Sequence, residues 1–229
     1  MPRPIIAIDG PAGSGKSTIA RIVAERLGHI YIDTGAMYRA VAVMSLEAGI
    51  SLDEPDRIVE LANKLDIHFK KVNSIQHILV DGCDVSEAIR TPEATRLSSP
   101  VSAIPGVRHR LVELQRKMGA GGGVVMEGRD IGTYVFPDAE VKVFLTASPE
   151  ERARRRVKDF EAAGIHADVE KVAADIRERD ERDSTRDMAP LCQADDAVLI
   201  NTDNMSIEEV ADAIIEIHNQ TLKIVRKDS

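Results

Sequence analysis

Short apolar runs, rich in β-branched residues, alternate along the chain with longer segments in which apolar residues recur every three or four positions. The short runs have the length and composition of buried β-strands, and the longer segments have the period of helices with one apolar face. They predict strands at Pro4–Asp9, Ile30–Asp33, Gly123–Met126, Val141–Leu145 and Ala197–Ile200. Strands that alternate with helices favour an α/β fold, in which a parallel five-stranded sheet is flanked by helices.

The middle of the chain interrupts this alternation. Asp66–Lys71 and Ile75–Val80 predict two strands joined by a tight turn at Val72-Asn73-Ser74, and a second turn at Asp81-Gly82 leads into a short strand at Cys83–Val85. Short strands joined by tight turns indicate a small antiparallel β subdomain. We therefore expect an inserted subdomain at residues 66–100, with residues 1–65 and 101–229 forming the core.

The C-terminal third carries two charged runs, Glu150–Lys158 and Ile176–Arg186, both rich in arginine. The ordinary interpretation of such a run is a solvated helix face held by ion pairs. Two arginine-bearing helices joined by a short connector around Gly164 also resemble a lid that could close over phosphates. We expect this helical lid at about residues 150–186.

A phosphate-binding motif follows the first predicted strand directly. G-P-A-G-S-G-K-S, Gly10–Ser17, matches the complete P-loop pattern G-x-x-x-x-G-K-[ST]. The glycines leave room for backbone N–H groups to surround phosphate oxygens, Lys16 carries charge to the β- and γ-phosphates, and the Ser17 hydroxyl can bind Mg²⁺. The residues expected to bind ATP are Gly10, Pro11, Ala12, Gly13, Ser14, Gly15, Lys16, Ser17 and Thr18.

GTPases are one alternative for a P-loop protein, and they require D-x-x-G and N-K-x-D. The chain contains N-K-L-D at Asn63–Asp66, but the preceding residues have a helical pattern, and D-x-x-G occurs nowhere. We therefore interpret N-K-L-D as a coincidence.

Two further motifs predict a second, anionic substrate. Asp33-Thr34-Gly35-Ala36-Met37-Tyr38-Arg39 follows a predicted strand and opens a helix that Asp33 or Thr34 could cap, and Glu127-Gly128-Arg129-Asp130 follows another strand. Ligands bind beyond the carboxyl ends of strands in open α/β sheets. Arg39 and Arg129 alone could form surface ion pairs, but together they favour a monophosphate acceptor held by bidentate contacts.

Composition narrows the remaining function classes. The 229 residues carry a net charge of −8 and only seven aromatic side chains, which argues against a nucleic-acid polymer as partner. Cys83 and Cys192 are too few and too far apart to indicate a disulfide framework or a cysteine metal site. No apolar run has the length of a membrane span, and the first residues lack a signal-peptide pattern, so we expect a cytoplasmic protein without a membrane partner. We also expect a monomer.

Four segments together resemble the bacterial cytidylate kinase family: G-P-A-G-S-G-K-S-T, D-T-G-A-M-Y-R, E-G-R-D-I-G-T-Y-V-F-P-D-A and E-R-D-E-R-D-S-T-R-D-M-A-P-L. They occur in that family's order, and the similarity covers nearly the whole chain. The resemblance implies a P-loop kinase core whose central insertion binds a nucleoside monophosphate. It also implies transfer of the γ-phosphoryl group of ATP to CMP or dCMP, with Mg²⁺ accompanying ATP.

The resemblance further implies roles for individual residues. It assigns Arg39, Arg129 and Arg186 to the acceptor phosphate, and makes Lys16, Arg129 and Arg186 the catalytic cations. It assigns Ser99, Arg108 and Asp130 to cytosine, with Thr34 close by, and Arg179 and Asp183 to the ribose. Arg155 and Arg156 are weaker candidates for the transferring phosphate. Ser17 stands where some relatives have glycine, which favours its role as the metal ligand.

Physical chemistry agrees with these roles. A carboxylate such as that of Asp130 can accept a hydrogen bond from the cytosine amino group, which uracil lacks. The acceptor phosphate is itself a nucleophile, so charge neutralisation and positioning suffice without a general base. Asp9, Asp33 and Glu127 all follow or end predicted strands and could each hold a metal-bound water. The alternatives are a P-loop kinase acting on UMP, AMP or a metabolite such as shikimate, and a nucleotide-dependent switch without catalysis.

Overall fold

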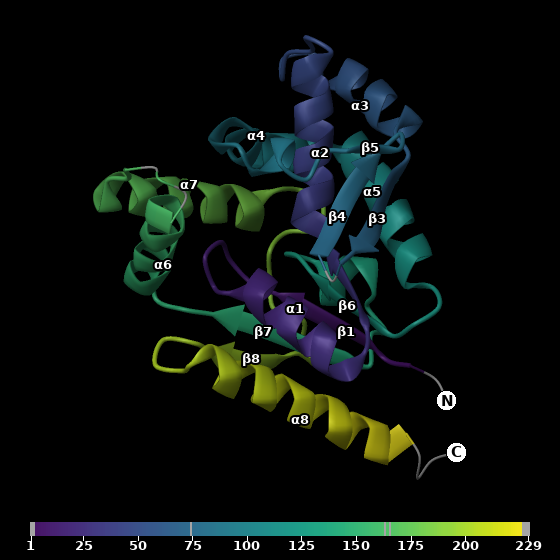
Figure 1. The fold of residues 1–229 in the computed structure, drawn as a ribbon, viewed down its shortest axis with the longest axis vertical. Coiled ribbons are helices and arrows are strands. Elements are labelled where there is room, and N and C mark those ends of the chain that lie inside the picture. The colour runs from purple at the N-terminus through teal and green to yellow at the C-terminus, as the bar shows by residue number, and fades with distance from the viewer. Residues whose placement is uncertain (1–2, 74, 163, 165, 226–229) are drawn as a thin grey trace. The chain divides into compact units, whose positions relative to one another are not determined.

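The computed structural model describes residues 3–73, 75–162, 164 and 166–225 (Figure 1). The chain divides into two compact units, one comprising Met1–Tyr31 with Gly121–Ser229 and the other Ile32–Ala120. Among the residues described, no helix combines the length and apolar character needed to cross a membrane.

The larger sheet has five strands in the order β2-β6-β1-β7-β8. Its strands are β1 (Ile5–Asp9), β2 (Ile30–Asp33), β6 (Val124–Glu127), β7 (Val141–Thr146) and β8 (Val198–Asn201). β1 pairs in parallel with both β6 and β7, so that Ile6 lies opposite Val125 on one side and Val141 on the other. A central parallel strand is covered on both faces, which explains why β1 is an uninterrupted apolar run up to Asp9. The predicted α/β sheet is confirmed.

Helices α1 (Lys16–Leu27) and α8 (Ile207–Val225) pack against each other beside this sheet (Figure 1). Their apolar residues recur at helical spacing, and the buried ones join a core with β1 and β7. α1 ends at Gly28, whose φ of 63° lies in the left-handed region that glycine adopts readily. Helix α1 is thereby stopped before β2 begins.

The charged runs form two helices, α6 (Pro149–Ala162) and α7 (Val169–Thr185), which contact each other closely. They share a small apolar cluster of Ala153, Val157, Val172 and Ile176. The two expected helices are therefore present as a packed pair, called here the lid helices, and their closing over phosphates remains a prediction; residues 163 and 165 of their connector lie outside the described part of the chain.

The second unit contains the smaller, antiparallel sheet, with strands β3 (Ile67–Val72), β4 (Ile75–Val80) and β5 (Cys83–Asp84). The predicted turn between β3 and β4 includes Ser74, which is not among the described residues. The unit's helices are α2 (Thr34–Glu47), α3 (Pro55–Lys64), the short η1 (Ala88–Arg90), α4 (Pro92–Ala103) and α5 (Pro105–Gly119). These helices and the sheet share one apolar core.

The predicted insertion, residues 66–100, falls entirely within the second unit. It contains the small sheet, η1 and most of α4. Its limits as a substrate-binding subdomain remain a prediction. Asn63 and Lys64 of N-K-L-D lie at the end of α3, as the helical pattern predicts.

Candidate active site

The P-loop joins β1 to α1 and depends on glycine at its first position. Gly10 has φ of 146°, and a Cβ atom there would lie 2.0 Å from the carbonyl oxygen of Leu145. Gly15, with φ of 91°, precedes α1 and provides no side-chain cap. The first N–H groups of a helix lack partners within the helix, and its positive end favours anions. The start of α1 can therefore bind phosphate.

Lys16 begins α1 and is buried at 5% exposure. Its ammonium group donates to the carbonyl oxygen of Pro11 at 2.7 Å and to Oγ of Ser14 at 3.3 Å. Burial, reinforced by the charges of Arg129 and Arg179 and opposed by that of Glu127, lowers the pKa of Lys16 to about 7. The P-loop cation and these arginines therefore act on one another electrostatically.

Asp9, the last residue of β1, holds the segment after β6 in place. Its two carboxylate oxygens each accept a 2.8 Å hydrogen bond, one from the backbone N–H of Ile131 and one from that of Gly132. These residues begin the short π-helix η2 (Ile131–Val135). Burial raises the pKa of Asp9 to about 7, although the two backbone hydrogen bonds oppose the increase. Both oxygens of Asp9 therefore accept hydrogen bonds that fix the backbone at the start of η2.

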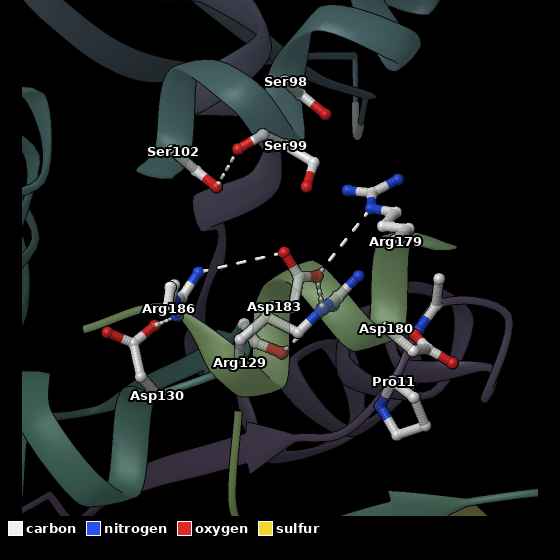
Figure 2. Close-up of polar contacts among 12 residues, drawn as sticks. Pro11, Ser98, Ser99, Ser102, Arg129, Asp130, Arg179, Asp180, Asp183 and Arg186 are labelled. Carbon is white, nitrogen blue, oxygen red and sulfur yellow. Dashed lines mark hydrogen bonds and ion pairs between the residues drawn. The ribbon is translucent and has the colours of Figure 1, made fainter. Parts of the chain in front are cut away.

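Three arginines converge on the carboxylate of Asp183 in α7 (Figure 2). Arg129 donates to it through Nε at 3.0 Å, Nε of Arg179 lies 3.9 Å away, and Nη1 of Arg186 lies 4.0 Å away. Burial of Asp183 raises its pKa, but the charges of these three guanidinium groups outweigh that effect and hold the pKa below its usual range. The result is a cluster of three arginines around the carboxylate of Asp183.

Asp130 joins the same network from the end of β6. Its side chain is buried, and its Oδ1 lies 3.4 Å from Nη2 of Arg186. Arg186 also donates through Nε to the carbonyl oxygen of Ala189 at 2.7 Å. The structure thus brings together the predicted residues Arg129, Asp130, Arg179, Asp183 and Arg186.

In the second unit, Asp33 and Arg39 are held as a pair at the start of α2. Asp33 caps the helix by accepting from the backbone N–H of Ala36 at 2.8 Å, and its other oxygen binds Nη2 of Arg39 at 2.9 Å. A Cβ atom on Gly35 would lie 3.1 Å from both Nη1 of Arg39 and Oδ1 of Asp33, so glycine leaves room for this pair. Thr34 is buried as the first residue of α2.

Arg108 in α5 is the largest fully buried side chain described. Its guanidinium donates to the carbonyl oxygen of Ser102 at 3.1 Å and lies 5.5 Å from the ring centre of Tyr38. Ser102 in turn donates to the carbonyl oxygen of Ser99, which is also buried (Figure 2). Two predicted cytosine-binding residues, Ser99 and Arg108, are therefore connected within this unit.

The lid arginines divide into exposed and engaged groups. Arg154 and Arg182 form ion pairs with Glu151 and Glu178 on their own helices, as expected for a solvated face. Arg156 lies over the ring of Phe160. Arg155 binds Oγ1 and the carbonyl oxygen of Thr202 at 2.9 and 2.8 Å, and its Nη1 would lie 3.7 Å from a Cβ atom on Gly15. Of the two weaker candidates, only Arg155 has this proximity to the P-loop among its described contacts.

Sequence reasoning missed Arg152 and Asp180. Both lie in runs interpreted as solvated faces, yet Arg152 is only 7% exposed. Asp180 accepts from the backbone N–H of Ala12 at 3.1 Å, and Arg152 donates to the carbonyl oxygen of Ala12 at 3.0 Å. The sequence signal that could have identified Arg152 is its place in the helix. It lies next to Ala153, which is buried in α6 together with Val157.

The predicted metal ligand Ser17 is exposed in the first turn of α1. Glu127, one of the acidic candidates, is buried and accepts a 2.7 Å hydrogen bond from the hydroxyl of Tyr31. Within the described residues, no group of three or more histidine, cysteine, aspartate or glutamate side chains is arranged to hold a metal ion.

Comparison with known proteins supplies the remaining observations. The family model described as cytidylate kinase matches residues 6–220. A cytidylate kinase of Carboxydothermus hydrogenoformans is 52% identical over 212 residues, covering 93% of this chain and 96% of that protein. A bifunctional pantoate ligase/cytidylate kinase of Synechococcus elongatus is 51% identical over 221 residues, covering 94% of this chain, which spans only 42% of that relative. A gluconokinase structure from Sinorhizobium meliloti shares the fold, with a TM-score of 0.50 at 15% identity over 100% of this chain and 98% of its own.

Proposed function

Because the chain belongs to the cytidylate kinase family, we propose that it transfers the γ-phosphoryl group of ATP to CMP or dCMP, giving ADP and CDP or dCDP. The observation that carries the proposal is geometric: Lys16 is buried at the start of α1, and three arginines surround the carboxylate of Asp183. A donor-phosphate cation and a cluster suited to an acceptor phosphate thus occur in one unit.

The donor side would rest on the P-loop. The start of α1 would present backbone N–H groups to the β- and γ-phosphates of ATP, and Lys16 would add a positive charge. Burial keeps water from screening that charge, so it acts strongly on a bound phosphate. Arg155, whose guanidinium lies close to Gly15, is the lid residue best placed to follow the transferring group.

The acceptor side would use Arg129 and Arg186 to hold the phosphate of CMP, with Arg39 of the second unit as the third arginine of the family motif. Asp183 holds Arg129 in place and keeps Arg186 close. A nucleoside monophosphate is largely dianionic near neutral pH and attacks without a general base. Positioning and charge neutralisation would therefore account for most of the rate enhancement.

The cytosine base would be recognised by Asp130, with Ser99, Arg108 and Thr34 as further contacts, and the ribose by Arg179 and Asp183. A buried carboxylate that accepts from the cytosine amino group would face a carbonyl oxygen in UMP. A site built on such a hydrogen bond rejects the wrong partner strongly, because a buried polar group is left unpaired. Selectivity for CMP over UMP follows from the chemistry of Asp130.

We propose Mg²⁺ as the ion that accompanies ATP. The exposed hydroxyl of Ser17 offers an oxygen ligand of the type that Mg²⁺ prefers. Asp9, Asp33 and Glu127 are each candidates for holding a metal-bound water, and both oxygens of Asp9 also accept backbone hydrogen bonds. When bound, the ion would neutralise phosphate charge. Replacement of Ser17 by alanine should then raise the Mg²⁺ concentration that gives half-maximal rate.

An assay of ADP release with CMP, dCMP, UMP, AMP and shikimate in parallel tests the proposed reaction. We expect kcat/KM for CMP or dCMP to exceed that for UMP by at least about 100-fold. Equal rates with UMP or AMP, or a preference for shikimate, would favour another small-molecule kinase. Binding of ATP without formation of any phosphorylated product would favour a nucleotide-dependent switch.

The setting of the reaction is part of the proposal. We propose that the reaction belongs to pyrimidine nucleotide metabolism and takes place in the cytoplasm, and we expect the chain to act as a monomer. Light scattering coupled to size-exclusion chromatography checks the last point, since a dimer would have twice the 25.0 kDa chain mass.

A further inference from the structure

We propose that Arg152 of α6 and Asp180 of α7 form a clamp that holds the P-loop in the conformation that binds ATP. Both act as positioning residues, because they contact the P-loop backbone and need not touch the nucleotide. The inference rests on the proposed function only in taking ATP as the ligand of the P-loop. We call these two side chains the Arg152–Asp180 clamp.

The clamp engages both backbone polar groups of one P-loop residue. The N–H of Ala12 donates to Oδ1 of Asp180 at 3.1 Å, and the carbonyl oxygen of Ala12 accepts from Nη1 of Arg152 at 3.0 Å. The same Nη1 forms an ion pair with Oδ2 of Asp180. Asp180 lies on α7 close to Pro11, the residue before Ala12 (Figure 2). The helices α6 and α7 thus both contact the P-loop backbone at Ala12.

Low solvent exposure distinguishes the Arg152–Asp180 clamp from the surface ion pairs of the same helices. The side chains of Arg152 and Asp180 are 8% and 18% exposed, unlike the neighbouring Arg154, which is 64% exposed. Arg152 also donates through Nε to the carbonyl oxygen of Ala147 at 3.1 Å, so its guanidinium has little freedom to turn away. A surface ion pair contributes little to structure, whereas hydrogen bonds from partly buried charged side chains to backbone are stronger and directional.

Gly13 completes the contact. A Cβ atom at Gly13 would lie 3.1 Å from both Cβ and the carbonyl oxygen of Arg152, so the loop packs directly on the α6 backbone. The loop therefore packs against α6 at Gly13, within the stretch expected to bind ATP. Loss of the Arg152–Asp180 clamp would free Ala12 and let the loop adopt conformations that bind ATP less well, lowering the competent fraction.

The acceptor side should survive loss of the Arg152–Asp180 clamp. Asp183 lies about one helical turn after Asp180 on α7 and is bound independently to Arg129. That second attachment keeps α7 at the arginine cluster when Asp180 is replaced. Weaker ATP binding with nearly unchanged CMP binding is therefore the distinguishing result.

A purely structural ion pair is the competing explanation, and a charge-free double variant separates the two. Removing one member of a buried ion pair leaves an unpaired charge and lowers stability, whereas replacing both by apolar residues of similar volume is often neutral or stabilising. Arg152→Met combined with Asp180→Leu should therefore recover the Tm that Asp180→Ala loses. It does not restore the two hydrogen bonds to Ala12, so it should still bind ATP weakly.

The experiment measures Kd for ATP and, separately, for CMP by calorimetric titration, together with Tm for each variant. We expect Asp180→Ala and the double variant to weaken ATP binding by about tenfold while Kd for CMP changes by less than about twofold. Asp180→Asn should lie between them and the wild type, because its amide oxygen can still accept from Ala12. Glu181→Gln, an exposed neighbour on the same helix, is the matched control and should bind ATP normally.

A double variant that binds ATP as tightly as the wild type would overturn the inference, as would equal weakening of ATP and CMP in Asp180→Ala. These outcomes are distinct from failure of the proposed reaction. The ATP titration requires no acceptor, and a wild-type chain that binds ATP but forms no CDP would refute the kinase assignment alone.

Discussion

Nε of Arg129 donates a 3.0 Å hydrogen bond to Oδ2 of Asp183, joining the segment after β6 to the end of α7. The carboxylate is 5% exposed in its side chain and also faces Arg179 and Arg186. One carboxylate thus lies close to three guanidinium groups, and two of these, Arg129 and Arg186, are proposed to hold the acceptor phosphate. This arrangement has consequences for both stability and catalysis.

Replacement of Asp183 by asparagine should lower stability at neutral pH by about 3 kcal/mol, because the arginines lose their shared partner. The pKa of Asp183 in the folded protein lies below its usual 3.8, so its contribution is present above that value and is lost as pH falls through the folded pKa. The Tm difference between wild type and variant should therefore shrink below about pH 4. Thermal unfolding measured from about pH 3 to pH 7 checks this, and a pH-independent difference would contradict it. Asp175→Asn on the exposed face of α7 is the control.

Replacement of Lys16 by methionine should reduce kcat/KM by at least about 100-fold while the fold survives, because the proposed role of its ammonium group is to stabilise charge on the transferring phosphate. Methionine fills similar buried volume without the ammonium group. Circular dichroism and Tm should stay close to wild type, and loss of either would instead indicate a structural role. Lys117→Ala at an exposed position of α5 is the matched control.

ATP binding should take up a proton at about pH 8. Burial, assisted by the charges of Arg129 and Arg179, lowers the pKa of free Lys16 to about 7, so the group is largely neutral one pH unit above that value. Nearby phosphate charge favours the protonated form, and ATP affinity should fall as pH rises above about 7. Calorimetry in buffers of different ionisation enthalpy measures the uptake. The Lys16→Met variant should lack it, and a binding enthalpy independent of buffer in the wild type would refute the prediction.

Replacement of Asp130 by asparagine should reduce the kcat/KM ratio of CMP to UMP by at least about tenfold, because an amide can donate to the uracil carbonyl oxygen. Asp130 also lies near Arg186, so some loss of rate with both substrates is expected. Equal losses for CMP and UMP would remove Asp130 from base recognition and leave it only the role of holding Arg186. Asp138→Asn, exposed after η2, provides the control.

Local patterns predicted most of the secondary structure because each signal lies within a few residues. The buried run before Gly10, the glycines of the P-loop and the helical spacing after Lys16 all specify one strand–loop–helix unit. Asp33 capping α2 is equally local, since the carboxylate reaches an N–H only three residues away. Strand ends moved by one residue in several cases, as at Gly123, where β6 begins at Val124.

The charged runs gave the least reliable prediction of which side chains are exposed and which are buried. Arg154 and Arg182 behave as the solvated interpretation predicts, but Arg152 in the same run is buried against the P-loop. An arginine on a helix carries the same local signal in both situations. Its partners, Ala12 and Asp180, lie 140 and 28 residues away along the chain, so their contacts arise only on folding.

The sequence by itself determined the chemistry available to this protein: a complete phosphate-binding loop, arginines at strand ends and a carboxylate next to one of them. Those features are encoded in contiguous motifs whose residue types and spacing carry the information. Only the tertiary structure decided which charges meet, because pairing depends on the distance and burial of groups far apart in the chain. In the folded chain, Asp183 interacts with three arginines, and the oxygens of Asp9 accept hydrogen bonds from the backbone of η2. Asp180 accepts a hydrogen bond from the P-loop backbone.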